Sequence, residues 1–284
     1  MLDIVLDVFI DTVKIIPFLY ITFLVMEYLE DVAKTGSIKL LKKYPAIGPV
    51  VGSAAGAFPQ CGFSAAASSL YSGGVITLGT LIAIFLSTSD EMLPILISEK
   101  VSFNTILSIL GMKFVIGLIS GLIIDAVFKV INKKHPHKEH HIHDICEDDH
   151  CGCEENHNIF LASLKHTVEV AFFIFVVSFL AACLIEGIGQ DNLSAFLEGN
   201  EILGVFLAAL VGLIPNCGAS VALTTLYLNH LITYGQAMAG LLVSAGVGLV
   251  VLFRTNRRNI KGSISIVVLL YIIGVLWGLI LSMF

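Results

Sequence analysis

Long runs of apolar residues alternate with short polar segments along most of the chain. A helix needs about 20 residues to cross the hydrocarbon core of a bilayer, and the runs have roughly this length. Four of them precede a long polar segment at 132–158, and four follow it. The pattern therefore predicts a membrane-spanning helix or helix pair in each run. The runs are 11–30, 45–71, 75–97, 104–131, 159–188, 202–227, 231–253 and 263–284.

The composition excludes a soluble protein. Of the 284 residues, 56% are hydrophobic and 13% are charged, whereas soluble domains have about 25% charged residues. A single globular core of this chain length could not bury so much apolar surface. The net charge of −6 argues against nucleic acid as a partner. The chain is therefore predicted to be an all-α polytopic membrane protein whose surroundings are the lipid bilayer.

The two halves of the chain share a motif that interrupts an apolar run. Pro59-Gln60-Cys61-Gly62 in the first half corresponds to Pro215-Asn216-Cys217-Gly218 in the second, and seven of thirteen aligned positions from each proline onward are identical. Proline and glycine both interrupt helices. Two glycine pairs, at 117 and 121 and at 274 and 278, match at nearly the same spacing. The sequence predicts a duplicated unit with repeats at 1–131 and 159–284, joined by a loop at 132–158.

Positive charges predict how the repeats are oriented. Lys and Arg gather at 34–43, 129–138 and 254–261, and such clusters face the cytoplasm. The connection at 190–201 has no Lys or Arg, although its counterpart in the first half is basic. We therefore expect inverted-topology repeats with a cytoplasmic central loop and both termini outside. Broken or re-entrant helices of such repeats meet near the bilayer midplane, where secondary transporters bind substrate.

The two motifs supply the first set of candidate substrate ligands. Gln60 and Asn216 offer amide groups, and serines three residues after each cysteine offer hydroxyls. The two cysteines form a soft pair suited to thiophilic metals or trivalent arsenic, although a free cysteine is commonly a small buried apolar residue. The candidate residues are Pro59, Gln60, Cys61, Gly62, Ser64, Pro215, Asn216, Cys217, Gly218 and Ser220.

A second set lies inside the run at 75–97, in Ser87-Thr88-Ser89-Asp90-Glu91. Ionisable residues within a membrane segment mark ion pathways by default. Asp90 and Glu91 are hard oxygen ligands that suit Mn²⁺ or proton exchange, with Ser87 and Thr88 beside them. The alternative is a helix cap at the membrane interface. Lys113 is also expected at the interface.

The central loop is the third candidate metal site. His-rich and Cys/His-rich tracts bind metal ions, but this spacing matches no closed structural zinc site. A flexible loop that collects or senses metal fits the pattern, and a solvated linker is the alternative. Its candidate ligands are His135, His137, His140, His141, His143, Cys146, Asp148, Asp149, His150, Cys151, Cys153 and His157.

The paired motifs, the two halves and the His-rich loop together resemble the ten-transmembrane heavy-metal exporter family, whose members are labelled manganese transporter or arsenic efflux protein. The resemblance implies export of a metal or metalloid across a bacterial or archaeal cytoplasmic membrane. It also implies about ten passages, which requires each interrupted run to count as two.

The leading functional hypothesis is secondary-active export of a divalent transition-metal cation, Mn²⁺ first, by alternating access. Efflux of arsenite or an organoarsenical is the alternative, and a membrane-embedded metal sensor is a third class. The sequence contains no His-Glu-x-x-His and no Walker A motif, so we expect neither an enzyme nor ATP coupling. A proton or another ion is the expected coupling partner, no cofactor is required, and the sequence leaves a homodimer open.

Overall fold

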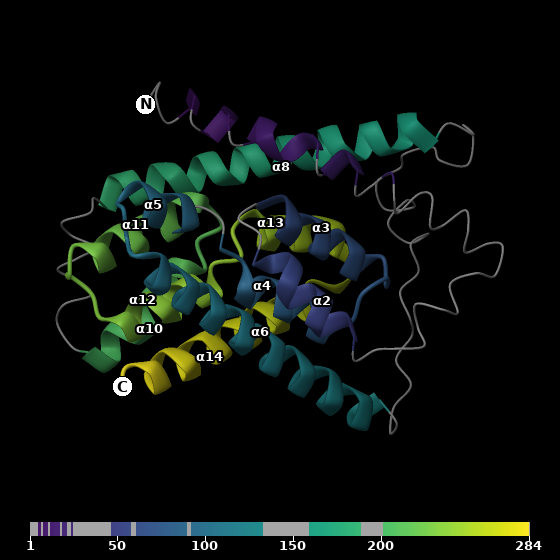
Figure 1. Cartoon of the computed structure of the whole chain (residues 1–284). Helices are drawn as coiled ribbons and strands as arrows, with labels where there is room; N and C mark the ends of the chain where they lie inside the picture. The colour runs from purple at the N-terminus through teal and green to yellow at the C-terminus, as the bar shows by residue number, and fades with distance from the viewer. Residues whose placement is uncertain are drawn as a thin grey trace.

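The computed structural model of the chain describes residues 5–6, 8–10, 12–17, 19–21, 24, 47–57, 61–89, 92–132, 159–188 and 201–283. Every regular element within these residues is a helix (Figure 1). The helices are α2 (Ile47–Gly56), α3 (Cys61–Ser72), α4 (Leu78–Ser87), α5 (Met92–Ser98), α6 (Phe103–Asn132), α8 (Ile159–Ile188), α10 (Glu201–Gly212), α11 (Cys217–Leu228), α12 (Tyr234–Val243), α13 (Val247–Thr255), η2 (Arg257–Asn259) and α14 (Ile260–Leu281).

Five described helical segments are long and apolar enough to cross a bilayer, which confirms an all-helical, multi-pass membrane protein. They differ greatly in how much of their surface the protein covers. The span Tyr234–Thr255 is 94% buried, whereas Ile260–Leu281 is 28% buried. The first is therefore central and the second faces the surroundings. The other three are Leu78–Ser98, Phe103–Val130 and Ser163–Leu180.

Both predicted interruptions are present. A ten-residue helix, α2, ends at Gly56, and α3 begins at Cys61. In the second half α10 ends at Gly212 and α11 begins at Cys217. A helix of ten to twelve residues is about 15–18 Å long, roughly half of the hydrocarbon thickness. Each of these two runs is thus a pair of half-length helices.

Two of the central spans are also discontinuous. The span Leu78–Ser98 consists of α4 and α5, and Tyr234–Thr255 consists of α12 and α13. Neither of these breaks is predicted from the sequence, which indicates interruptions only at the two Pro-Gln-Cys-Gly and Pro-Asn-Cys-Gly motifs. The first break follows Ser87 at the end of α4, and the second break, at Ser244-Ala245-Gly246, separates α12 from α13. The second break forms because Gly246 has a φ of 51°, in a region that favours glycine, and because the Ala245 amide bonds to Val243 O instead of continuing the helix.

The two halves use equivalent packing contacts. Gly121 of α6 lies against Gly79 and Ala83 of α4, and Gly278 of α14 lies against Gly235 and Ala239 of α12. The N-caps of α4 and α12 are also equivalent threonines. Small residues let the helix backbones approach closely, as is common between membrane helices.

Helices of the two halves are interleaved. Ser64 of α3 touches Gly248 of α13, and the hydroxyls of Ser72 and Thr255 are 2.8 Å apart, so these two helices run parallel. In the equivalent contact α11 packs against α5. Along one side, the described residues between 5 and 24, called here the N-terminal helix, lie beside α8 (Figure 1), and Ile15 and Leu19 share a buried apolar cluster with Val170 and Ile174 of α8.

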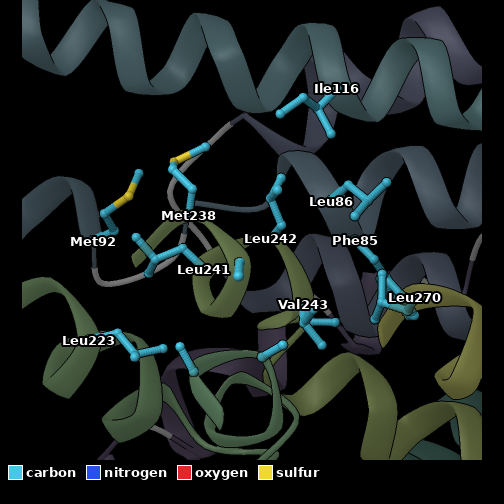
Figure 2. Close-up of a cluster of buried hydrophobic side chains, with 14 of the residues drawn as sticks. Phe85, Leu86, Met92, Ile116, Leu223, Met238, Leu241, Leu242, Val243 and Leu270 are labelled. Atoms are coloured by element: carbon cyan, nitrogen blue, oxygen red, sulfur yellow. The ribbon is translucent and has the colours of Figure 1, made fainter. Parts of the chain in front are cut away.

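An apolar core lies between the halves (Figure 2). It joins Phe85 and Leu86 of α4 with Leu241 and Leu242 of α12. Leu270 of α14 lies beside Phe85 in Figure 2 and is fully buried. This core fixes the position of the two discontinuous spans relative to each other.

The glycine contacts give a test of the packing. A methyl group at position 121 would lie 2.6 Å from Gly79 O and 2.8 Å from Ala83 Cβ, whereas position 111 of the same helix has open space around it. Overpacking costs about 1–3 kcal/mol, so Gly121→Ala should lower the Tm by about 3–10 °C. Gly111→Ala is the matched control and should leave the Tm nearly unchanged. Equal Tm values for the two variants would contradict the close contact of α4 and α6.

Candidate ion site at the helix breaks

The N-terminal part of α3, which follows the first interruption, lies where α13 begins. A Cβ atom at Gly248 would be 2.8 Å from Ser64 Cβ, and Ser68 Oγ donates a hydrogen bond of 2.6 Å to Gly248 O. Ser64 is completely buried, and Gly62 is buried too. Pro59 and Gln60 lie outside the described residues, as does the side chain of Cys61. The described part of the first motif is thus held against the second discontinuous span.

The second interruption is held by Asn216. Its side-chain oxygen accepts a hydrogen bond of 3.1 Å from the Gly218 amide and caps α11, the role that asparagine commonly has at an N-cap. Its side-chain amide donates to Ser178 O of α8 at 3.1 Å. Pro215 precedes this cap, and Ser220 is buried one turn later. Asn216 therefore fixes the tip with one N–H group and one lone pair, and each end of its carboxamide keeps one further bonding position. The side chain of Cys217 lies outside what the structure describes.

A small cavity links this tip to α13. It has a volume of about 20 Å³, which is room for about one water molecule. Asn216, Ser178 and Val247 line it together with Thr12 of the N-terminal helix. Since Ser64 contacts Gly248 and Asn216 borders the same cavity as Val247, described parts of both motifs lie at the first turn of α13.

The first discontinuous span breaks at its predicted polar segment. Ser87 Oγ donates to Ala83 O at 2.7 Å, Thr88 Oγ1 to Ile84 O at 2.7 Å and Ser89 Oγ to Ala57 O at 2.9 Å. All three hydroxyl-bearing residues are buried. Each hydroxyl uses its single proton on a carbonyl and keeps lone pairs that can accept or ligate. Asp90 and Glu91 follow them and lie outside the described residues.

Lys113 is a functional candidate that the sequence analysis misplaces. The expectation that it lies at the membrane interface is wrong, because the residue is 1% exposed. Its ammonium donates to Thr88 O in the first break and to Leu241 O of α12 at 2.8 Å. Its position deep within the run at 104–131 is a sequence signal that could have identified it as a functional candidate, since charged residues inside membrane segments are rare and usually functional.

No group of three or more His, Cys, Asp or Glu side chains lies together among the residues that the structure describes. The candidate ligands of the loop, from His135 to His157, all lie outside that part of the chain. Within it, the chemistry offered at the breaks consists of hydroxyl oxygens, backbone carbonyls at helix ends, one capping amide and one ammonium group.

A comparison with protein families identifies the chain. Residues 1–189 match the family described as "Putative, 10TM heavy-metal exporter". The chain belongs to this family. No curated protein and no solved structure matches it. In secondary transporters, discontinuous helices in the centre of the protein commonly bind the ion, because they free carbonyl groups inside the membrane.

Proposed function

We propose that this protein is a secondary-active exporter that carries a divalent transition-metal cation, with Mn²⁺ as the leading candidate, by alternating access. The observation that carries the proposal is the buried break between α4 and α5. There the hydroxyls of Ser87, Thr88 and Ser89 are buried in the protein interior, and two carboxylates follow directly in the sequence. Membership of a heavy-metal exporter family supports export as the direction.

The ligand chemistry favours a hard cation. Asp90 and Glu91 would supply negative charge, and hydroxyl oxygens of the break would add neutral ligands to an oxygen-rich shell that suits Mn²⁺. Gln60 and the serines of the two motifs would add neutral oxygens from the adjacent tips. Asn216 already bonds to Gly218 and Ser178, so we assign it to shaping the tip.

We further propose that the halves are inverted repeats and that α2–α3 and α10–α11 are re-entrant hairpins. Contacts of Gly48 with Thr80 and of Gly56 with Ser87 show that α2 runs parallel to α4. The pair α2 and α3 lies toward the same end of the molecule, as α10 and α11 do toward the other (Figure 1). Both features support tips that enter the protein and return.

A pseudo-two-fold axis between α6 and α14 is also supported by a polar contact. Trp277 Nε1 donates to Ser120 Oγ at 3.3 Å, and the two residues are 157 residues apart, as are the matched glycines of the same helices. Equivalent positions that touch each other lie on the axis that relates them. Alternating access would then be a movement of the tips and spans about this axis, with the loop at 132–158 on the cytoplasmic side collecting metal.

Efflux of arsenite is the second candidate, because a cysteine stands at the equivalent place in each half. Cys61 is the first residue of α3, and Cys217 is the first residue of α11. Both helices begin in the same central region as the breaks. Two thiolates that approach from the two tips would form a soft site for trivalent arsenic.

Transport by the purified full-length protein in proteoliposomes tests the proposal. Flux of Mn²⁺, Zn²⁺, Fe²⁺, Co²⁺ and arsenite is measured with and without a pH gradient, against liposomes without protein. We expect gradient-dependent Mn²⁺ flux well above the control, with weaker flux of the other divalent ions. Arsenite flux without any divalent-cation flux would overturn the proposal in favour of the second candidate.

A further inference from the structure

The ammonium group of Lys113 lies where two half-helices from different halves of the chain end. Thr88 is the C-cap of α4, and Leu241 is in the last turn of α12, which ends at Val243. Lys113 donates to the carbonyl of each. The last carbonyls of a helix have no partner within the helix and carry partial negative charge. Two such negative ends therefore converge on one buried cation.

The second break explains why the Leu241 carbonyl is available. In a continuous helix it would accept a hydrogen bond from the amide of Ala245. That amide bonds to Val243 O at 2.8 Å instead, because the helix stops. The break between α12 and α13 thus leaves the Leu241 carbonyl without its helical partner, and the ammonium of Lys113 on α6 donates a hydrogen bond to it.

Convergent backbone carbonyls at helix ends inside a membrane protein form the kind of site that holds small monovalent cations. We infer that Lys113 is a tethered cation, and that its ammonium occupies a monovalent-cation site built from the ends of α4 and α12. The covalent tether replaces an ion that would otherwise have to be drawn from solution.

The second half shows that this cation is a specific addition. The residue equivalent to Lys113 is Leu270 of α14, 157 positions later, and Leu270 is fully buried in the apolar core. The segment equivalent to Thr88–Glu91 is Ser244-Ala245-Gly246-Val247, which has no charge. Lysine and carboxylates thus occur together at the first break only.

A consequence for transport rests on the proposed function. With Lys113 in place, the exporter needs no Na⁺ at this position, and the carbonyls of Thr88 and Leu241 are kept from the divalent substrate. The inference about the binding site itself is tested without transport, so the two can fail separately.

Thermal unfolding of the purified full-length protein in detergent tests the site. Lys113→Ala is compared with Leu270→Ala, which truncates the equivalent residue without removing a charge. Each is measured in choline chloride, tetramethylammonium chloride, sodium chloride and methylammonium chloride. We expect Lys113→Ala to lower the Tm in choline by at least about 5 °C, and methylammonium or Na⁺ to restore at least half of that loss. Leu270→Ala should lose stability equally in all four salts.

Two results would overturn the inference. The first is a Tm of Lys113→Ala that shows the same loss in all four salts, or no loss at all. If Lys113→Ala cannot be purified, Lys113→Gln and Lys113→Met are measured instead, because their longer side chains fill more of the space left by lysine. The second overturning result comes from these variants. Wild-type stability of both neutral variants in choline would show that no cation is needed there. Rescue by methylammonium together with no divalent-cation flux in the wild type would retain the site and reject the proposed substrate.

Discussion

Replacement of Asp90 by Asn, or of Glu91 by Gln, should reduce Mn²⁺ flux in proteoliposomes to the level of liposomes without protein. Each change keeps the shape of the side chain and removes one negative charge from the neighbourhood of the cation. A carboxylate 4 Å from a divalent cation contributes roughly 8 kcal/mol at an effective dielectric constant of about 20. Even a quarter of that value would weaken binding roughly thirty-fold.

Glu99 provides the matched control for this pair. It directly follows Ser98, the last residue of α5, and is exposed. Glu99→Gln therefore also removes one negative charge, but from a position outside the break between α4 and α5. Its Mn²⁺ flux should stay within about two-fold of wild type, since an exposed charge is well screened by water and salt. If the two carboxamide variants instead transported as well as Glu99→Gln, the acids of the break would not bind the substrate.

Much of the fold could be predicted because its signals are local. The helix predicted at 159–188 has the same bounds as α8, and the one predicted at 104–131 differs by one residue at each end from α6. The two interruptions could also be placed, because proline followed closely by glycine interrupts a helix regardless of tertiary context. Apolar length, proline and glycine are properties that a sequence displays directly.

The second break and the location of Lys113 depend on contacts between distant segments. Gly246 has no adjacent proline and is one of 25 glycines, so nothing local distinguishes it from the glycines that pack inside helices. The ammonium of Lys113 bonds to carbonyls that are 25 and 128 residues away. The depth of Lys113 within its run marks it as a candidate, but snorkelling is the ordinary behaviour of a lysine in an apolar run. Its bonding partners on α4 and α12 are set by the tertiary arrangement.

The residues of the candidate site could therefore be predicted from the sequence only in part. The sequence marked Ser87 and Thr88 as candidate ligands beside Asp90 and Glu91 without predicting a helix break there, and it placed Asn216 in an interruption. It gave Asn216 as a substrate ligand, which stays a prediction, and the structure adds a capping role that uses one bond at each end of the side chain. The distinction between a ligand and a cap cannot be made from residue type, because the same amide serves both roles.

Replacement of Cys61 and Cys217 by serine separates the two candidate substrates. For a hard cation bound by the acids of the first break, the double variant should transport Mn²⁺ within about two-fold of wild type, because hydroxyl oxygen is an acceptable neutral ligand for Mn²⁺. For arsenite, loss of both sulfur ligands should abolish protein-dependent efflux, while Asp90→Asn and Glu91→Gln should leave it nearly intact. Serine is well tolerated at helix starts, and both cysteines begin a helix, so folding should not confuse the result.

Cys183→Ser in α8 is the control for the cysteine pair, because Cys183 is a half-buried free cysteine outside the two motifs. It should be silent for both substrates. Flux of Mn²⁺ and of arsenite is thus measured for the acid variants and for the cysteine variants. A hard site and a soft site predict opposite patterns of loss in these four measurements. Should the acid and cysteine variants all retain wild-type flux after reaching the membrane, neither cluster would bind the substrate. The amide of Gln60 and the hydroxyls of the tips would remain, and their neutral hydrogen-bonding chemistry would favour a polar organic substrate over either ion.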